Sequence, residues 1–113
     1  MATKELVAAS SRPLVLSILE RGESYGYAII QEVKALSGGE LEWTDGMLYP
    51  VLHRLEREGL IKSRWGKAPD TGRKRKYYTL SRDGGQALQA EKAQWLNVHN
   101  TLAQLWGVPS CKI

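Results

Sequence analysis

Residues 44–65 read TDGMLYPVLHRLEREGLIKSRW, and they contain a helix and a strand in direct succession. The apolar residues recur at helical spacing and share one face of a predicted helix. They are Leu48, Val51, Leu52 and Leu55. Thr44 or Asp45 can cap this helix, and Gly59 closes it. Residues 60–65 alternate in part, as a strand does, so the stretch predicts an amphipathic helix that leads into a β-strand.

A basic hairpin follows. Residues 66–72, GKAPDTG, are turn-forming types, and residues 76–80, KYYTL, predict a second strand. Residues 64–76 hold six basic side chains and one acidic side chain, a net charge of +5. The whole chain has a net charge of +4, so the other residues together have a net charge of −1. Such a concentration of positive charge is typical of a protein that binds nucleic acid or another anionic surface.

Two more helices precede this stretch. Residues 14–19 form an apolar cluster that ends at Gly22. Pro13 indicates either a helix start close to itself or a kink in a helix that begins around Lys4. Residues 24–39, SYGYAIIQEVKALSGG, predict a second helix with Ser24 as its N-cap and the glycine pair as its end.

A long helix closes the chain, capped by Ser81 and ending near Trp106. Its apolar residues form a coiled-coil-like seam: Leu88, Trp95 and Leu102 at sevenfold spacing, with Val98 and Leu105 offset by three. The order of elements predicts a mostly α (α+β) fold. A winged helix-turn-helix with a two-stranded β-wing spans residues 1–80, a C-terminal dimerisation helix spans 81–106, and a tail spans 107–113. Nothing within one chain is predicted to cover the seam.

The helix-turn-helix arrangement identifies candidate DNA contacts. Its second helix enters the major groove, so Tyr49, His53 and Arg54 are expected to face base edges and phosphates. The preceding helix starts with a hydroxyl-rich group, Ser24, Tyr25 and Tyr27, and free N–H groups there suit a phosphate. The hairpin adds cations for the phosphate backbone or the minor groove. These are Lys67, Arg73, Lys74, Arg75 and Lys76.

Each assignment has an alternative. Arg54 and Arg57 could pair with Glu58 or other local acids on a solvated face. Ser24 could be only a cap, with one neighbouring tyrosine in the core. The basic run could serve solubility alone. The fold could also be a protein-interaction module whose basic wing docks an acidic partner, since a fold does not settle a function.

Three segments together resemble the PadR family of bacterial transcriptional regulators. They are SYGYAIIQEV at 24–33, GMLYPVLHRLEREGLIKSRW at 46–65, and GRKRKYYTLSRDG at 72–84. The resemblance spans Leu14 to about Leu88 and its motifs are highly specific. His53 departs from the pattern, because many members carry lysine there. The single closing helix is similar to the short branch of the family, which includes multidrug-responsive repressors, whereas other members respond to phenolic acids.

The resemblance implies a repressor that binds a pseudo-palindromic double-stranded DNA operator as a homodimer, with the last helix packed on the partner's first helix. The dimer interface would contain the seam residues Leu88, Trp95, Val98, Leu102 and Leu105. In the multidrug-responsive relatives, the tryptophan that matches Trp95 faces its symmetry mate, and flat aromatic compounds stack between the two. Trp95 is therefore either part of a slot for a planar aromatic or cationic effector, or dimer core. Trp43 and Trp65 are expected to pack or to support the base of the wing, and Trp106 to anchor the helix end.

The sequence contains no positive evidence for other classes of function. His53 and His99 lie on different predicted helices and, with the lone Cys111, form no cluster at metal-ligand spacing. The sequence has no phosphate-binding glycine loop and no nucleophile motif, so we expect neither enzymatic activity nor a cofactor. A single cysteine favours a reducing compartment, and no apolar run approaches the roughly 18 residues of a membrane span. We therefore expect a cytoplasmic protein without membrane contact.

Overall fold

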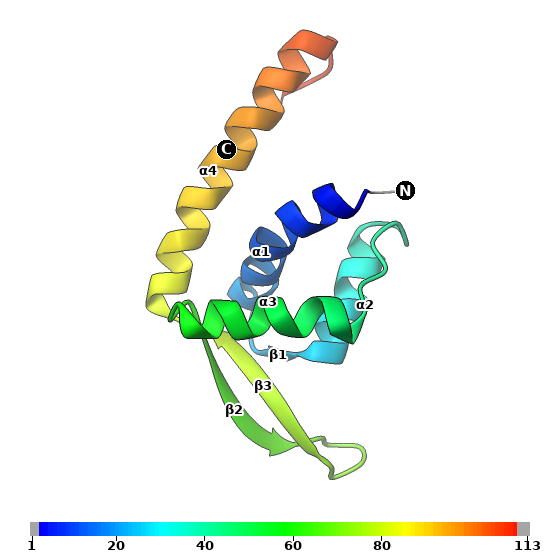
Figure 1. Cartoon of the computed structure of the whole chain (residues 1–113), viewed down its shortest axis with the longest axis vertical. Coiled ribbons are helices and arrows are strands. Elements are labelled where there is room, and N and C mark those ends of the chain that lie inside the picture. The colour runs from blue at the N-terminus through cyan, green and yellow to red at the C-terminus, as the bar shows by residue number, and fades with distance from the viewer. Residues whose placement is uncertain (1–2, 111–113) are drawn as a thin grey trace.

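Four helices and a small antiparallel sheet make up residues 3–110, which the computed structural model describes (Figure 1). The helices are α1 Lys4–Glu20, α2 Gly26–Leu36, α3 Asp45–Arg57 and α4 Arg82–Trp106. The strands are β1 Ser24–Tyr25, β2 Ile61–Lys67 and β3 Lys74–Leu80. This order confirms the predicted winged helix-turn-helix with a long closing helix. Cys111 lies outside the described residues.

Helix α1 begins well before Pro13. The Oγ1 atom of Thr3 accepts a hydrogen bond from the backbone N–H of Leu6 at 3.2 Å and caps the helix. Of the two predicted starts, the earlier one near Lys4 is therefore the one observed. Pro13 lies inside the helix, where it removes one backbone donor.

The sheet has the strand order β1-β3-β2, so the predicted two-stranded wing is present and carries one additional short strand. Ser24 pairs with Tyr78 and Tyr25 pairs with Tyr77. The predicted N-cap role of Ser24 is wrong, because Ser24 lies in β1 and the N-cap of α2 is Tyr25. Two residues show no periodicity, so β1 could not be predicted from the sequence. The strand ties the start of α2 to the wing.

The wing strands extend further toward the tip than predicted. Lys67 lies opposite Lys74, so residues 66–67 and 74–75 are also strand residues and the loop shrinks to 68–73. The loop is closed by a hydrogen bond from the Ala68 N–H to the Arg73 carbonyl at 2.8 Å, and Gly72 adopts a left-handed conformation with φ of 70°.

One core joins α1, α2, α3, the base of the sheet and the start of α4. Its fully buried side chains are Val15, Leu16, Ile29, Val33, Leu48, Leu52, Leu55, Ile61, Tyr78 and Leu88. Three of the four predicted apolar positions of α3 are among them, whereas Val51 is half-buried. The polar face of α3 is thereby turned outward.

The start of α4 is fixed to the turn that follows α3. Ser81 Oγ accepts a hydrogen bond from the Gly84 N–H at 3.0 Å and donates one to the Gly59 carbonyl at 2.6 Å. A Cβ atom on Gly84 would overlap the carbonyl oxygen of Leu60. Only glycine allows this close approach of helix and backbone.

Beyond its first turns, α4 diverges from α1 and projects away from the other elements (Figure 1). Leu88 is buried in the chain's own core, while Trp95, Val98 and Leu105 are exposed. Within residues 3–110, no helix combines the length and apolar character that crossing a membrane requires.

Candidate nucleic-acid interface

Helix α3 presents an exposed polar face that includes Tyr49, His53, Arg54 and Arg57. The alternative in which Arg54 or Arg57 pairs with Glu58 is not observed, because Glu58 binds Arg12 instead. Neither arginine side chain makes a hydrogen bond or ion pair with any of residues 3–110. Both guanidinium groups are therefore available to an anionic ligand.

Tyr49 joins the two helices of the helix-turn-helix. A Cβ atom built on Gly26 would lie 2.7 Å from the Tyr49 hydroxyl oxygen, so the tyrosine packs directly on the backbone at the start of α2. The rings of Tyr49 and His53 lie 6.3 Å apart between centroids. The tyrosine thus has a packing role as well as an exposed edge.

The N-terminus of α2 lies beside this face and has no side-chain cap. Tyr25 occupies the N-cap position without making a capping hydrogen bond. The first backbone N–H groups of α2 therefore have no side-chain cap, and the helix dipole at this end favours an anion such as a phosphate. Tyr27, in the first turn, is exposed. Ser24, by contrast, lies half-buried in the sheet, and Tyr25 packs edge-on against Tyr77 with 5.8 Å between ring centroids.

The basic residues of the wing alternate between its two faces, as a strand requires. Lys74 and Lys76 lie over the ring of Trp65, with Nζ 5.0 Å and 5.8 Å from its centroid. The guanidinium of Arg75 stacks on the ring of Tyr25 at 3.9 Å on the other face. Lys67 and Arg73 are exposed, and their side chains have no hydrogen bond or ion pair with the described residues.

Several wing cations already have acidic neighbours. Arg64 forms a two-pronged hydrogen bond with Glu23, at 2.8 Å and 2.7 Å, and this bond lowers the pKa of the Glu23 carboxyl. Arg75 lies 3.8 Å from Asp70, and Lys76 lies 3.9 Å from Glu56. Part of the charge counted in the sequence is therefore neutralised within the chain.

Trp65 is a candidate contact that the sequence interpretation missed. Trp43 has 5% of its surface exposed and packs in the core as expected, but Trp65 is 59% exposed. The alternation of β2 puts Trp65 on the same side as buried Ile61. The strand extends past the core before it reaches Trp65, so the indole lies outside the core, beside Lys74 and Lys76.

These elements enclose one groove of about 680 Å³ between α3, the start of α2 and the wing. Its lining includes Tyr25, Tyr27, Tyr49, His53, Trp65, Arg73, Lys74, Arg75 and Lys76. Most of the predicted DNA contacts are thus brought together. Arg54, Lys67 and Ser24 are not in this lining.

A separate apolar cavity of about 400 Å³ lies between α1 and α4. Trp95, 40% exposed, contributes to it together with Leu6, Pro13, Leu14 and others of α1. In the described part of the chain, no group of three or more histidine, cysteine, aspartate or glutamate side chains could hold a metal ion.

Comparison with known proteins places this arrangement among gene regulators. A family model described as "Transcriptional regulator PadR-like family" matches residues 15–90. A PadR-like transcriptional regulator from Bacillus cereus has a similar structure, with a TM-score of 0.79, 26% identity, and coverage of 91% of this chain and 97% of that one.

Two further matches are also transcriptional regulators. A PadR family regulator from Eggerthella lenta is 33% identical, with a TM-score of 0.73 and coverage of 90% and 86%. The transcriptional regulator YqjI of Escherichia coli is 32% identical over 83 residues, which are 74% of this chain but only 38% of YqjI.

Proposed function

Because the chain belongs to the PadR-like family of transcriptional regulators, we propose that it binds double-stranded DNA as a homodimer and acts as a repressor. This is a family of regulators and not of enzymes. The observation that carries the proposal is the common groove of α3, α2 and the wing, which Arg73 lines. Arg73 and, on the exposed face of α3 outside this lining, Arg54 and Arg57 have no acidic partner among residues 3–110.

On DNA, α3 would lie in the major groove with Tyr49, His53 and Arg54 toward the bases. The uncapped start of α2 would hold a phosphate. The wing would follow the backbone or enter the adjacent minor groove through Arg73. Trp65, flanked by two ammonium groups, would pack its ring against a sugar while its neighbours neutralise phosphates.

A second copy of the chain would cover the exposed face of α4. Trp95, Val98 and Leu105 form an apolar row that one chain leaves open to water. Leu88 is already covered in its own chain, so the interface would depend on the residues that follow it. Two wings and two recognition helices would then meet a pseudo-palindromic operator with half-sites about 34 Å apart.

The cavity beside Trp95 supports release by a planar aromatic or cationic molecule. Its walls are mostly apolar, and an indole face attracts flat rings and cations. The competing role for Trp95 is dimer core. Quenching of tryptophan emission by a planar cationic dye, lost in Trp95→Ala, would support the slot, and equal quenching in both proteins would exclude it.

Fluorescence anisotropy with labelled DNA from upstream of the chain's own gene tests the main proposal. A scrambled duplex and two salt concentrations serve as controls. We expect a preference of about 10³ or more for the upstream DNA, with a steep salt dependence. Binding to both duplexes that a wing-neutralised variant reproduces would overturn the proposal in favour of a wing that docks an acidic protein.

A further inference from the structure

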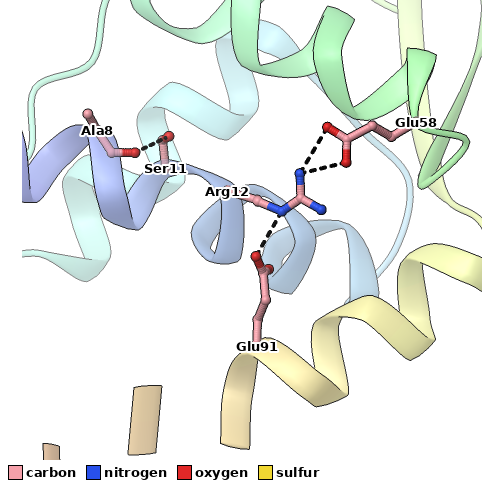
Figure 2. Close-up of polar contacts among 5 residues, drawn as sticks. All are labelled: Ala8, Ser11, Arg12, Glu58 and Glu91. Carbon is pink, nitrogen blue, oxygen red and sulfur yellow. Dashed lines mark hydrogen bonds and ion pairs between the residues drawn. The ribbon is translucent and has the colours of Figure 1, made fainter. Parts of the chain in front are cut away.

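Arg12, in the middle of α1, joins α3 to α4 through two carboxylates (Figure 2). Its Nε donates a hydrogen bond to Glu91 Oε1 at 2.8 Å. Its Nη1 donates to both carboxylate oxygens of Glu58, at 2.9 Å and 3.1 Å. Burial opposes the charge of Arg12, but the hydrogen bonds to Glu58 and Glu91 outweigh it and raise the pKa of the guanidinium. The guanidinium thus bridges the two carboxylates.

Glu58 is the C-cap residue of α3. Its backbone N–H donates to the Arg54 carbonyl at 3.0 Å, so the carboxylate is attached to the last turn of the helix. That turn carries the free guanidinium groups of Arg54 and Arg57. Arg12 therefore holds the end of the recognition helix from the side away from the groove.

Glu91 marks the place where α4 leaves the body of the chain. Leu88, about one turn earlier, is buried, whereas Trp95, about one turn later, is exposed. The start of α4 is fixed at Ser81, so a change in the direction of the helix moves Glu91 more than it moves the start. The other polar links between α4 and α1 are longer, with Glu20 at 3.9 Å from Lys92 and 3.4 Å from Gln89.

We propose that Arg12 is a positioning residue that couples the direction of α4 to the placement of α3 on DNA. This inference rests on the proposed function, because it needs α3 to bind DNA and α4 to respond to a partner or effector. When α4 moves and Glu91 withdraws, Arg12 retains Glu58 alone, and the last turn of α3 loses its fixed link to α4. A bridge that served stability only would leave DNA discrimination unchanged.

The experiment uses the full chain and the two duplexes described above. The wild-type protein must first prefer the upstream DNA, since failure at that step would count against the proposed function and not against Arg12. Glu91→Gln is then compared with Glu20→Gln, which makes the same chemical change and adds the same charge. Glu20 also links α1 to α4, through Lys92 and Gln89, but it forms no hydrogen bond or ion pair with α3.

Each variant removes one negative charge from the protein, and this change alone should make both variants bind every duplex somewhat more tightly. We expect Glu20→Gln to leave the preference for upstream DNA unchanged and Glu91→Gln to lower it about five- to tenfold, in the range of typical coupling between sites. In an Arg12→Met background, Glu91→Gln should no longer change the preference. Arg12→Lys, which keeps the charge but cannot reach both carboxylates with one fork, should resemble Arg12→Met.

Equal effects of Glu91→Gln and Glu20→Gln would overturn the inference. A Glu91→Gln effect of the same size in the wild-type and Arg12→Met backgrounds would also overturn the inference. The double-mutant cycle would then show no interaction between Arg12 and Glu91. Urea unfolding of each variant accompanies the binding data. A variant with reduced stability but an unchanged preference would mean that the bridge is only a structural link.

Discussion

Arg73 and Arg64 have the same chemistry on the same wing but different surroundings, and this difference yields a quantitative prediction. Arg73 is exposed without an acidic partner in residues 3–110, whereas Arg64 is held by Glu23. A plot of the logarithm of the binding constant against the logarithm of the salt concentration has a negative slope. Each phosphate that the protein neutralises steepens this salt slope by about 0.9. In a dimer with two wings, Arg73→Gln should therefore reduce the slope by about 1.8.

The same relation gives the loss in affinity. If the Arg73 contact is purely ionic, the variant should bind about 60-fold more weakly at 0.1 M salt and only about 5-fold more weakly at 0.4 M. Anisotropy titrations across this range measure both quantities. The loss should be equal for upstream and scrambled DNA, because phosphate contacts carry no sequence information.

The matched control is the double variant Glu23→Gln with Arg64→Gln, which removes the ion pair without changing the net charge. Its salt slope should stay within about 0.3 of the wild-type slope, since a cation already neutralised releases few counterions from DNA. An unchanged slope in Arg73→Gln would refute the assignment of Arg73 to a phosphate. A drop of similar size in the double variant would show that Arg64 leaves Glu23 to bind DNA.

Four other predictions concern stability, ionisation and the wing. Gly84→Ala should destabilise the fold by about 3 kcal/mol in urea unfolding, because its methyl group would overlap a backbone carbonyl that cannot withdraw easily. Tyr78→Phe should stabilise the fold by about 1 kcal/mol, because the buried hydroxyl finds no partner within residues 3–110; a loss of stability would reveal an unseen partner. The hydrogen bond from Arg64 lowers the pKa of Glu23, so the pair's contribution is present at neutral pH and lost as pH falls through that lowered pKa; carbon NMR should find a midpoint below that of an ordinary glutamate. Trp65→Ala should weaken DNA binding about tenfold in anisotropy while Trp65→Phe retains most of it, and equal losses would argue against ring packing.

The order and type of the main elements could be predicted because their signals are local. The apolar repeat of α3, its Thr44 cap and the turn at Gly59 lie within one stretch of sequence, and Ser81 and Gly107 bound α4 in the same way. Strand β1 has only two residues, so its pairing with β3 depends on the folded chain. The sequence alone could not decide where α1 begins, because a proline is compatible both with the first turn of a helix and with a kink inside one.

The candidate site was predictable in its residue types but not in its pairings. Tyr49, His53 and Arg73 do line the groove, as their positions in a winged helix suggested. The partners that decide which groups are free lie far apart in the chain: Arg12 is 46 residues from Glu58 and 79 from Glu91. Such contacts leave no periodic signal, so the competition for Glu58 could be resolved only in three dimensions.

The ion pairs of the wing lower the number of its cations that are expected to contribute to the salt dependence of DNA binding. The sequence counts six cations in residues 64–76, which would give two wings a combined salt slope of about −11. Arg64, Arg75 and Lys76 each lie within 4 Å of an acidic oxygen, so Lys67, Arg73 and Lys74 remain as the cations without one. Three per subunit would correspond to a slope of about −5 for a dimer. On the proposed function, a wing of that strength would position the protein on any DNA, and it would leave discrimination between sequences to α3 and to the contacts that fix its orientation.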